Sequence, residues 1–193
     1  MRELVYYVAV SLDGFIADPD GGFDAFPIEG DHAAVVFDEY ADALPVHALT
    51  ALGIEPSRTR FDTVIMGSNT MAPALAIGIT SPYPHLRQFV ASRRPPDHDP
   101  AITVTDDPLS TVRDLKTHDG LDIWLCGGGE LAGALLPEVD RLVLKRQPLV
   151  FGSGVPLFGR APYKPRAFTR IRTRPFESGV VVEEYAASGP RHT

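Results

Sequence analysis

Residues 121–136 read LDIWLCGGGELAGALL and contain a strand, a turn and a helix in immediate succession. The apolar run at 121–126 has the length of a buried strand, three glycines follow it, and residues 130–136 read as a helix despite Gly133. Without a Cβ atom, a glycine turn lets the backbone approach a ligand closely, and the helix after it presents unpaired N–H groups to an anion. The stretch therefore favours an α/β fold and makes the turn a candidate site for a nucleotide phosphate.

Two interpretations of the glycine turn stay open. Gly127, Gly129 and Ala132 fit the relaxed G-x-G-x-x-A spacing of dinucleotide-binding turns, but Gln147 stands about where that pattern has a ribose-binding acid. The alternative is a close crossing of strand and helix that needs small residues for packing alone.

A second apolar run, at 63–67, also ends in glycine, and Ser68, Asn69 and Thr70 suit the start of a helix. Two such strand ends would suit a ligand that spans both, whereas ordinary helix capping by Ser68 or Asn69 is the alternative. The other expected elements are a strand at 5–11 with a turn at 12–14, an irregular loop at 18–30, a helix from an Asp31 cap to about Leu44, strands at 87–92 and 101–105, a helix from Pro108 capped by Asp107, and strands at 141–147, 167–174 and 180–185.

This order of elements predicts a single three-layer α/β domain with a central mixed, mainly parallel sheet. We expect the sheet to be parallel through Cys126 and to be closed by antiparallel C-terminal strands. The domain is expected to span 1–187, with 188–193 as a tail. Arg170, Arg172 and Arg174 alternate along one of the last strands, where Glu183 or Glu184 could pair with them.

The composition excludes several classes of protein. The 193 residues carry a net charge of −7 and are 44% hydrophobic, which is typical of a folded domain and unsuited to nucleic acid. The apolar runs fall well short of the ~18 residues that a membrane span needs. A single cysteine, Cys126, excludes a disulfide framework and a multi-cysteine zinc site and favours a reducing cytoplasm. The motifs of serine hydrolases, P-loop proteins and zinc peptidases are absent, and we expect no metal.

Polar residues near the expected strand ends are further candidates. Ser92, Arg93 and Arg94 could hold a phosphate monoester, although a solvated arginine pair is an equal alternative. Asp13 and Asp38 are the acids best placed to face a pocket. A turn acid and a solvated helix face are the competing interpretations of these two carboxylates.

Four ordered segments resemble the dihydrofolate reductase-like family, which includes the reductase domain of bacterial riboflavin biosynthesis. They are VAVSLDGFIA at 8–17, residues 64–71, residues 123–136, and PLVFGSG at 148–154 with PLF at 156–158. The zinc deaminase domain that accompanies this reductase in bifunctional chains has no counterpart here, because its H-x-E and P-C-x-x-C motifs do not occur. The resemblance thus implies a stand-alone reductase, and it also implies a homodimer.

The resemblance implies NADPH as the cofactor. The expected contacts are Ala9 and Ile16 at the nicotinamide, Gly67, Ser68, Asn69, Thr70, Gly127, Gly128, Gly129, Glu130 and Leu131 at the phosphates, and Ser92 and Arg93 at the adenosine phosphate. The family usually has arginine where this chain has Ser68, so one expected positive charge is missing, and Arg93 and Arg94 could replace it.

The implied reaction transfers a hydride to a small unsaturated substrate, such as a pterin, a pyrimidine or a carbonyl compound. We place Ser11 and Asp13 at the substrate and take Asp38 or a bound water as the candidate proton source. The alternative function is a non-catalytic nucleotide- or ligand-binding protein that retains the reductase fold.

Overall fold

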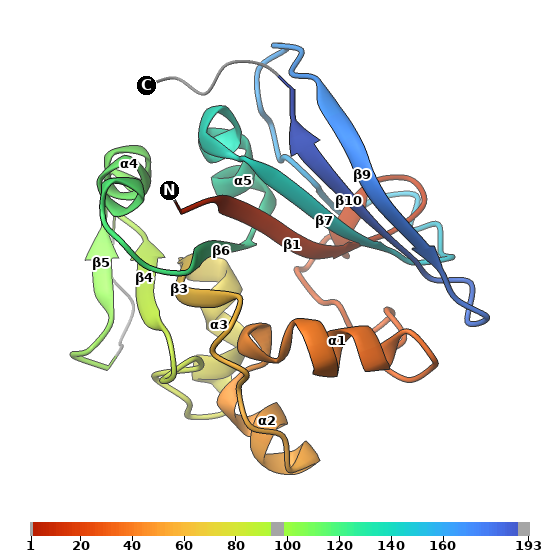
Figure 1. The fold of residues 1–193 in the computed structure, drawn as a ribbon, viewed down its shortest axis with the longest axis horizontal. Helices are drawn as coiled ribbons and strands as arrows, with labels where there is room; N and C mark the ends of the chain where they lie inside the picture. The colour runs from red at the N-terminus through yellow and green to blue at the C-terminus, as the bar shows by residue number, and fades with distance from the viewer. Residues whose placement is uncertain (1, 94–98, 189–193) are drawn as a thin grey trace.

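The computed structural model describes residues 2–93 and 99–188. They form an eight-stranded sheet in the order β5-β4-β3-β6-β1-β7-β10-β9 and a two-stranded sheet of β2 and β8 (Figure 1). The strands are β1 Leu4–Val10, β2 Phe15–Ala17, β3 Phe61–Gly67, β4 Arg87–Ala91, β5 Thr103–Thr105, β6 Asp122–Gly127, β7 Arg141–Arg146, β8 Val155–Pro156, β9 Phe168–Pro175 and β10 Val181–Ala187. The helices are α1 Ala33–Glu39, α2 Val46–Leu52, α3 Ser68–Ala76, α4 Pro108–Thr117 and α5 Gly129–Leu135, with short 3₁₀ turns η1 Ala41–Ala43 and η2 Leu136–Glu138.

Helices cover both faces of the large sheet, which gives the three expected layers. Helices α1, α2 and α3 lie on one side, and α4 and α5 lie on the other (Figure 1). Because side chains alternate along a strand, β1 sends Leu4 and Tyr6 into the core with α4 and α5, and Val5 and Tyr7 into the core with α1 and α3. Each face of the sheet therefore has its own apolar core.

The mixed sheet confirms the predicted fold class, with one correction to the strand directions. The parallel part extends beyond β6, because β7 pairs in parallel with β1 from Val5–Arg141 to Val10–Arg146. The chain returns through α5 and η2 before β7 begins, and such a crossover restores the strand direction. Antiparallel pairing starts only with β10 on β7 and continues with β9 on β10.

The predicted helix from Asp31 to about Leu44 is wrong at both its cap and its length. Asp31 does not cap α1, because its carboxylate accepts hydrogen bonds from the amides of Glu177 and Ser178. The helix stops at Glu39, and the fully buried Tyr40 stacks on Tyr7 with 4.1 Å between ring centroids. Long-range contacts thus replace the local pattern on which the prediction was based.

The structure confirms the predicted cap of α4 and adds elements and contacts that the sequence did not predict. The Asp107 side chain caps α4 by accepting from the amide of Ser110 at 3.0 Å, as predicted. Helix α2 and the small β2–β8 sheet were not predicted. Arg172 lies 3.7 Å from Glu184, as expected, but its closer partner is Glu39 at 3.3 Å. Ser188, assigned to the tail, donates its amide to the carbonyl of Ala167.

A single buried carboxylate holds together the segment that leads into β3. Asp42 is fully buried and accepts hydrogen bonds from the Ser57 hydroxyl and from the amides of residues 58–61. Burial alone would raise the pKa of Asp42, but these bonds hold it below its usual value. The 3₁₀ turn after α1 therefore positions the start of a central strand.

We expect Asp42→Asn to destabilise the fold by about 3 kcal/mol, because an amide group brings N–H donors to face backbone donors in a buried site. Urea unfolding at neutral pH measures the change. The stabilisation by the carboxylate should be fully present above its unfolded-state pKa of about 3.9 and should be lost as the pH falls through the lower folded-state pKa. Asp38→Asn is the matched control, since Asp38 is exposed and should change stability by no more than about 0.5 kcal/mol. Equal effects of the two changes would contradict this account.

Candidate functional site

The carboxyl ends of three neighbouring strands meet at one edge of the sheet. Met66 of β3 is in register with Gly127 of β6, and Gly67 is in register with Ala91 of β4. Adjacent strands lie about 4.8 Å apart, so this edge spans about 10 Å. The two glycine-ended strands recognised in the sequence therefore lie side by side, and β4, which leads to Ser92 and Arg93, follows directly.

The two glycine turns face each other with little between them. A Cβ atom on Gly67 would lie 3.7 Å from the amide nitrogen of Gly128, and one on Gly128 would lie 3.5 Å from the Thr70 hydroxyl. The Gly127–Gly128 peptide bond is cis. We call Gly67, Thr70, Gly127 and Gly128 the glycine edge.

Helix α3 starts at the glycine edge without a side-chain cap. Its N-cap is Gly67, and neither Ser68 nor Asn69 makes the capping bond that the alternative interpretation required. Unpaired amides in the first turn of a helix attract anions. This end of α3 is therefore suited to a phosphate group.

The third glycine has a different role. Gly129 is buried at the start of α5, where a Cβ atom would overlap the carbonyl oxygen of Pro156. Leu131 packs in the core, and the exposed Glu130 pairs with Arg160 at 3.1 Å. Packing against Pro156 is thus sufficient to require a small residue at Gly129, and contacts of Gly129, Glu130 and Leu131 with a cofactor stay predictions.

The remaining expected cofactor residues are separated by the sheet. The amide of Ser92 donates to the carbonyl of Thr105, and Arg93 beside it is exposed; Arg94 lies outside the described residues. Alternation along β1 puts Ala9 on the face with α1 and α3, whereas Ile16 packs against the core with α4 and α5. The contacts of Ser92, Arg93, Ala9 and Ile16 with a cofactor stay predictions.

Ser11 and Asp13 form a turn rather than an open binding surface. The buried Ser11 donates its hydroxyl to Asp13 at 2.5 Å and accepts from the amide of Phe15. Asp13 also accepts from the amides of Phe151 and Gly152. The Ser11 bond, followed by those two amides, lowers the pKa of Asp13 to about 2. These contacts agree with a turn acid, and a role with substrate stays a prediction.

Asp38 is not brought together with the glycine edge. It lines an open polar pocket of about 530 Å³ with Glu39, Arg60, Asp122 and Arg141. Residues 60, 122 and 141 stand at the amino ends of β3, β6 and β7, which is the opposite edge of the sheet. This position does not support Asp38 as a proton source, and that role stays a prediction.

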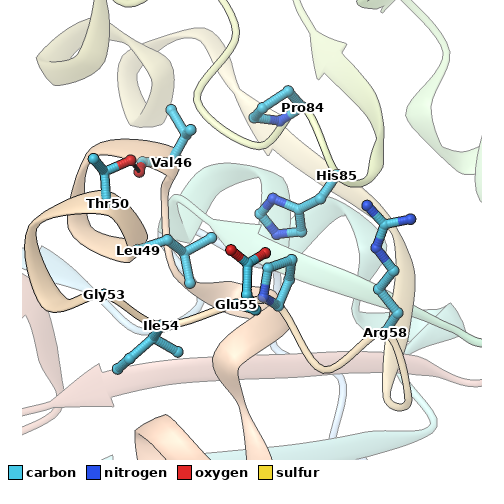
Figure 2. Close-up of a pocket in the computed structure, with 10 residues that line it drawn as sticks. Val46, Leu49, Thr50, Gly53, Ile54, Glu55, Arg58, Pro84 and His85 are labelled. Carbon is cyan, nitrogen blue, oxygen red and sulfur yellow. Dashed lines mark hydrogen bonds between the residues drawn. The ribbon is translucent and has the colours of Figure 1, made fainter.

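A second hollow also lies away from the glycine edge. It has a volume of about 630 Å³, and Figure 2 shows its lining by α2, the segment after it and the residues before β4. His85 closes one side and lies within 2.9 Å of the Asp42 carbonyl oxygen. Its residues are Val46, Leu49, Thr50, Gly53, Ile54, Glu55, Pro56, Arg58, Pro84 and His85.

Sequence reasoning missed a half-buried polar group beside β1. Lys145 of β7 extends over the Tyr7 ring, with 4.4 Å from its nitrogen to the ring centroid. Burial lowers the pKa of Lys145 to about 8, and burial raises that of the nearby Cys126 to about 12. Within RLVLKRQ at 141–147 the lysine occupies an alternate strand position, and that position was the only local signal.

The described part of the chain has neither a candidate metal cluster nor a membrane-spanning helix. Across residues 2–93 and 99–188, no three His, Cys, Asp or Glu side chains lie close enough to hold a metal ion. No helix in the same ranges is long and apolar enough to cross a membrane.

Comparisons with known proteins agree with this geometry. The chain matches the family model described as the RibD C-terminal domain over residues 2–182. It is 31% identical over 164 residues to the uncharacterized protein YwjB of Bacillus subtilis (strain 168), which covers 81% of this chain and 83% of that protein.

Two solved structures share the fold. A Shewanella sp. PV-4 protein, provisionally described as a riboflavin biosynthesis protein, has a TM-score of 0.67 at 22% identity and covers 98% of this chain and 100% of its own. Dihydrofolate reductase from Enterococcus faecalis, complexed with NADP(H) and RAB-propyl, has a TM-score of 0.62 at 15% identity and covers 97% of each chain. The fold is thus dihydrofolate reductase-like, and the chain belongs to the family of the RibD C-terminal domain.

Proposed function

We propose that this protein is an NADPH-dependent reductase of a small molecule with a C=N or C=O group. The observation that carries the proposal is the glycine edge, where two glycine turns and the uncapped start of α3 lie together. The structural likeness to a reductase complexed with NADP(H) supports it.

The residues at the edge fit a dinucleotide. Gly67, Gly127 and Gly128 have no side chains, so a pyrophosphate can approach their backbone closely, and the α3 amides supply hydrogen-bond donors. At the far end, the exposed Arg93 supplies a guanidinium for a 2′-phosphate. The bound cofactor would supply a hydride from the nicotinamide C4.

The chain itself would position the reactants and exclude water. Ala9 lies on the face of β1 that α1 and α3 cover, so a substrate held on this face is shielded by the helix layer. Holding two reactants in contact removes much of the entropic barrier of a bimolecular step.

NADPH binding and turnover test the function directly. The single tryptophan, Trp124, is buried in β6 under α3, so we expect quenching of its fluorescence when NADPH binds. Single-turnover oxidation of bound NADPH with pterins, aminopyrimidines and small carbonyl compounds then tests the reaction. Absence of NADPH binding would overturn the proposal, and binding without oxidation across the panel would favour the non-catalytic alternative.

Arg93→Ala should lower the affinity for NADPH by about 10- to 150-fold and leave the affinity for NADH nearly unchanged. A charge-assisted bond to the 2′-phosphate contributes about 1.5–3 kcal/mol, and NADH has no such phosphate. Titration of tryptophan fluorescence with each cofactor measures both affinities.

Arg87→Ala is the matched control, because Arg87 is an exposed arginine at the opposite end of the same strand. We expect it to bind both cofactors as the unchanged protein does. Equal losses for NADPH and NADH in Arg93→Ala would show that Arg93 does not contact the 2′-phosphate.

A further inference from the structure

The sheet face under α1 carries polar side chains that the fold does not use. Lys145 of β7 is in register with Ala9 of the neighbouring strand β1, and its ammonium lies over the Tyr7 ring. Cys126 of β6, on the other side of β1, packs against the core on the same face of the sheet. Lys145, Gln147, Tyr7 and Cys126 form what we call the β7 cluster.

The ammonium of Lys145 is left without a hydrogen-bond acceptor. The side chain is half-buried, and within the described ranges its nitrogen contacts the Tyr7 ring but has no carboxylate or carbonyl oxygen at hydrogen-bond distance. Removing an ammonium in part from water without giving it an acceptor costs free energy, even above an aromatic ring. Such a group is stabilised if a ligand supplies the missing oxygen or nitrogen.

Gln147 provides an independent observation on the same face. Its side chain is 3% exposed, and its Oε1 atom has no hydrogen-bond partner within the part of the chain that the structure describes. The backbone continues extended there, because the Gln147 amide donates to the Val10 carbonyl. Residues two apart in an extended segment project to the same side about 7 Å apart, so the amide lies beside Lys145. The buried hydroxyl of Tyr7 also lacks a partner among the described residues.

The β7 cluster adjoins the glycine edge. Cys126 directly precedes Gly127, and Ala9, the expected nicotinamide contact, is the registered partner of Lys145. A substrate placed between them would meet the cofactor on one side and the ammonium on the other.

We propose that Lys145 is a catalytic residue that binds the heteroatom of the reducible C=N or C=O group and donates a proton to it. This inference rests on the proposed function. The π bond of the substrate breaks, its carbon gains the hydride and forms a C–H bond, and its oxygen or nitrogen takes a proton from the Lys145 ammonium. The neutral amine then regains a proton from water.

Gln147 would orient the same substrate. Its free Oε1 accepts a hydrogen bond, so it fits an N–H or O–H group next to the reducible bond. An ammonium donor and an amide acceptor side by side select a substrate with an acceptor and a donor in neighbouring positions.

Among the titratable groups around it, Lys145 is the one whose charge changes near pH 8. Burial raises the pKa of Tyr7, Tyr83 and Cys126, so all three are neutral there. From β10, the residue in register with Lys145 is the apolar Val182. Arg174 of β9 is in register with Val182, two strands from Lys145, and pairs with Glu39 of α1, which also pairs with Arg172. Glu184 of β10 lies near Arg60, Arg141 and Arg172, and Asp38 of α1 is exposed.

Lys145→Met separates a catalytic from a structural role. Methionine keeps most of the length of the side chain and removes the half-buried charge, so we expect a higher urea midpoint of unfolding than in the unchanged protein. The difference should narrow as the pH rises from about 8 to about 10.5, because the unchanged lysine then loses its charge in the folded state first. A lower midpoint would show that the contact with Tyr7 is structural and would overturn the inference.

The chain has three lysines, which makes Lys145 easy to observe. Lys116 pairs with Asp140 at 2.6 Å, and Lys164 is exposed. Reductive ¹³C-methylation gives each lysine an NMR resonance, and the Lys145 resonance is assigned by its loss in Lys145→Met. We expect this resonance to titrate near pH 8 and to shift on addition of NADP⁺ and then of pterin. If neither addition moves this resonance while Trp124 fluorescence reports NADPH binding, the role of Lys145 is refuted and the proposed function stands.

Turnover completes the test. With a substrate from the panel, Lys145→Met should oxidise bound NADPH about 10²- to 10⁴-fold more slowly, and its affinity for NADPH should be unchanged. In the unchanged protein we expect the oxidation rate to fall above pH 8, and in Lys145→Met we expect no such fall. Lys164→Met is the matched control and should leave the rate unchanged. A rate in Lys145→Met within a few-fold of the unchanged protein would refute proton donation.

Discussion

Parallel pairing of β3 with β6 is the constraint on which the site depends. It sets the glycine ends of the two strands side by side, and the helices that follow them leave to opposite faces. Helix α3 packs with Met71 in the core under α1, whereas α5 packs with Leu131 in the core beside α4. Where neighbouring strands send their helices to opposite faces, a crevice opens at their carboxyl ends, and α/β proteins bind ligands there.

The sequence predicted those features whose causes are local. Glycine after an apolar run marked the ends of β3 and β6, and Asp107 before Pro108 marked the start of α4. The direction of β7 was not predictable in this way, because a parallel and an antiparallel strand can have the same residue pattern. Direction follows from the crossover through α5, whose existence was predicted but whose path over the sheet was not.

Where distant groups compete with local ones, the pattern failed. Asp31 has the residue type and position of a helix cap, but two amides of the turn between β9 and β10 bind its carboxylate instead. The same reasoning applies to Asp38, which lines a pocket at the amino ends of β3, β6 and β7 and not at their carboxyl edge. To assign one acid to a pocket, the first and last residues of its helix must be known. The end of α1 depends on the packing of Tyr40 on Tyr7.

The two halves of the candidate site differ in what holds a ligand. At the glycine edge the backbone does so, because missing side chains and free amides suit a phosphate, and glycines in a sequence reveal that arrangement. In the β7 cluster side chains do so, and Lys145 becomes unusual only through burial by residues that lie far from it in the chain. The charges differ accordingly. The planar guanidinium of Arg93 suits a phosphate, whereas the half-buried amine of Lys145 can gain and lose a proton and therefore suits the place where a bond is made.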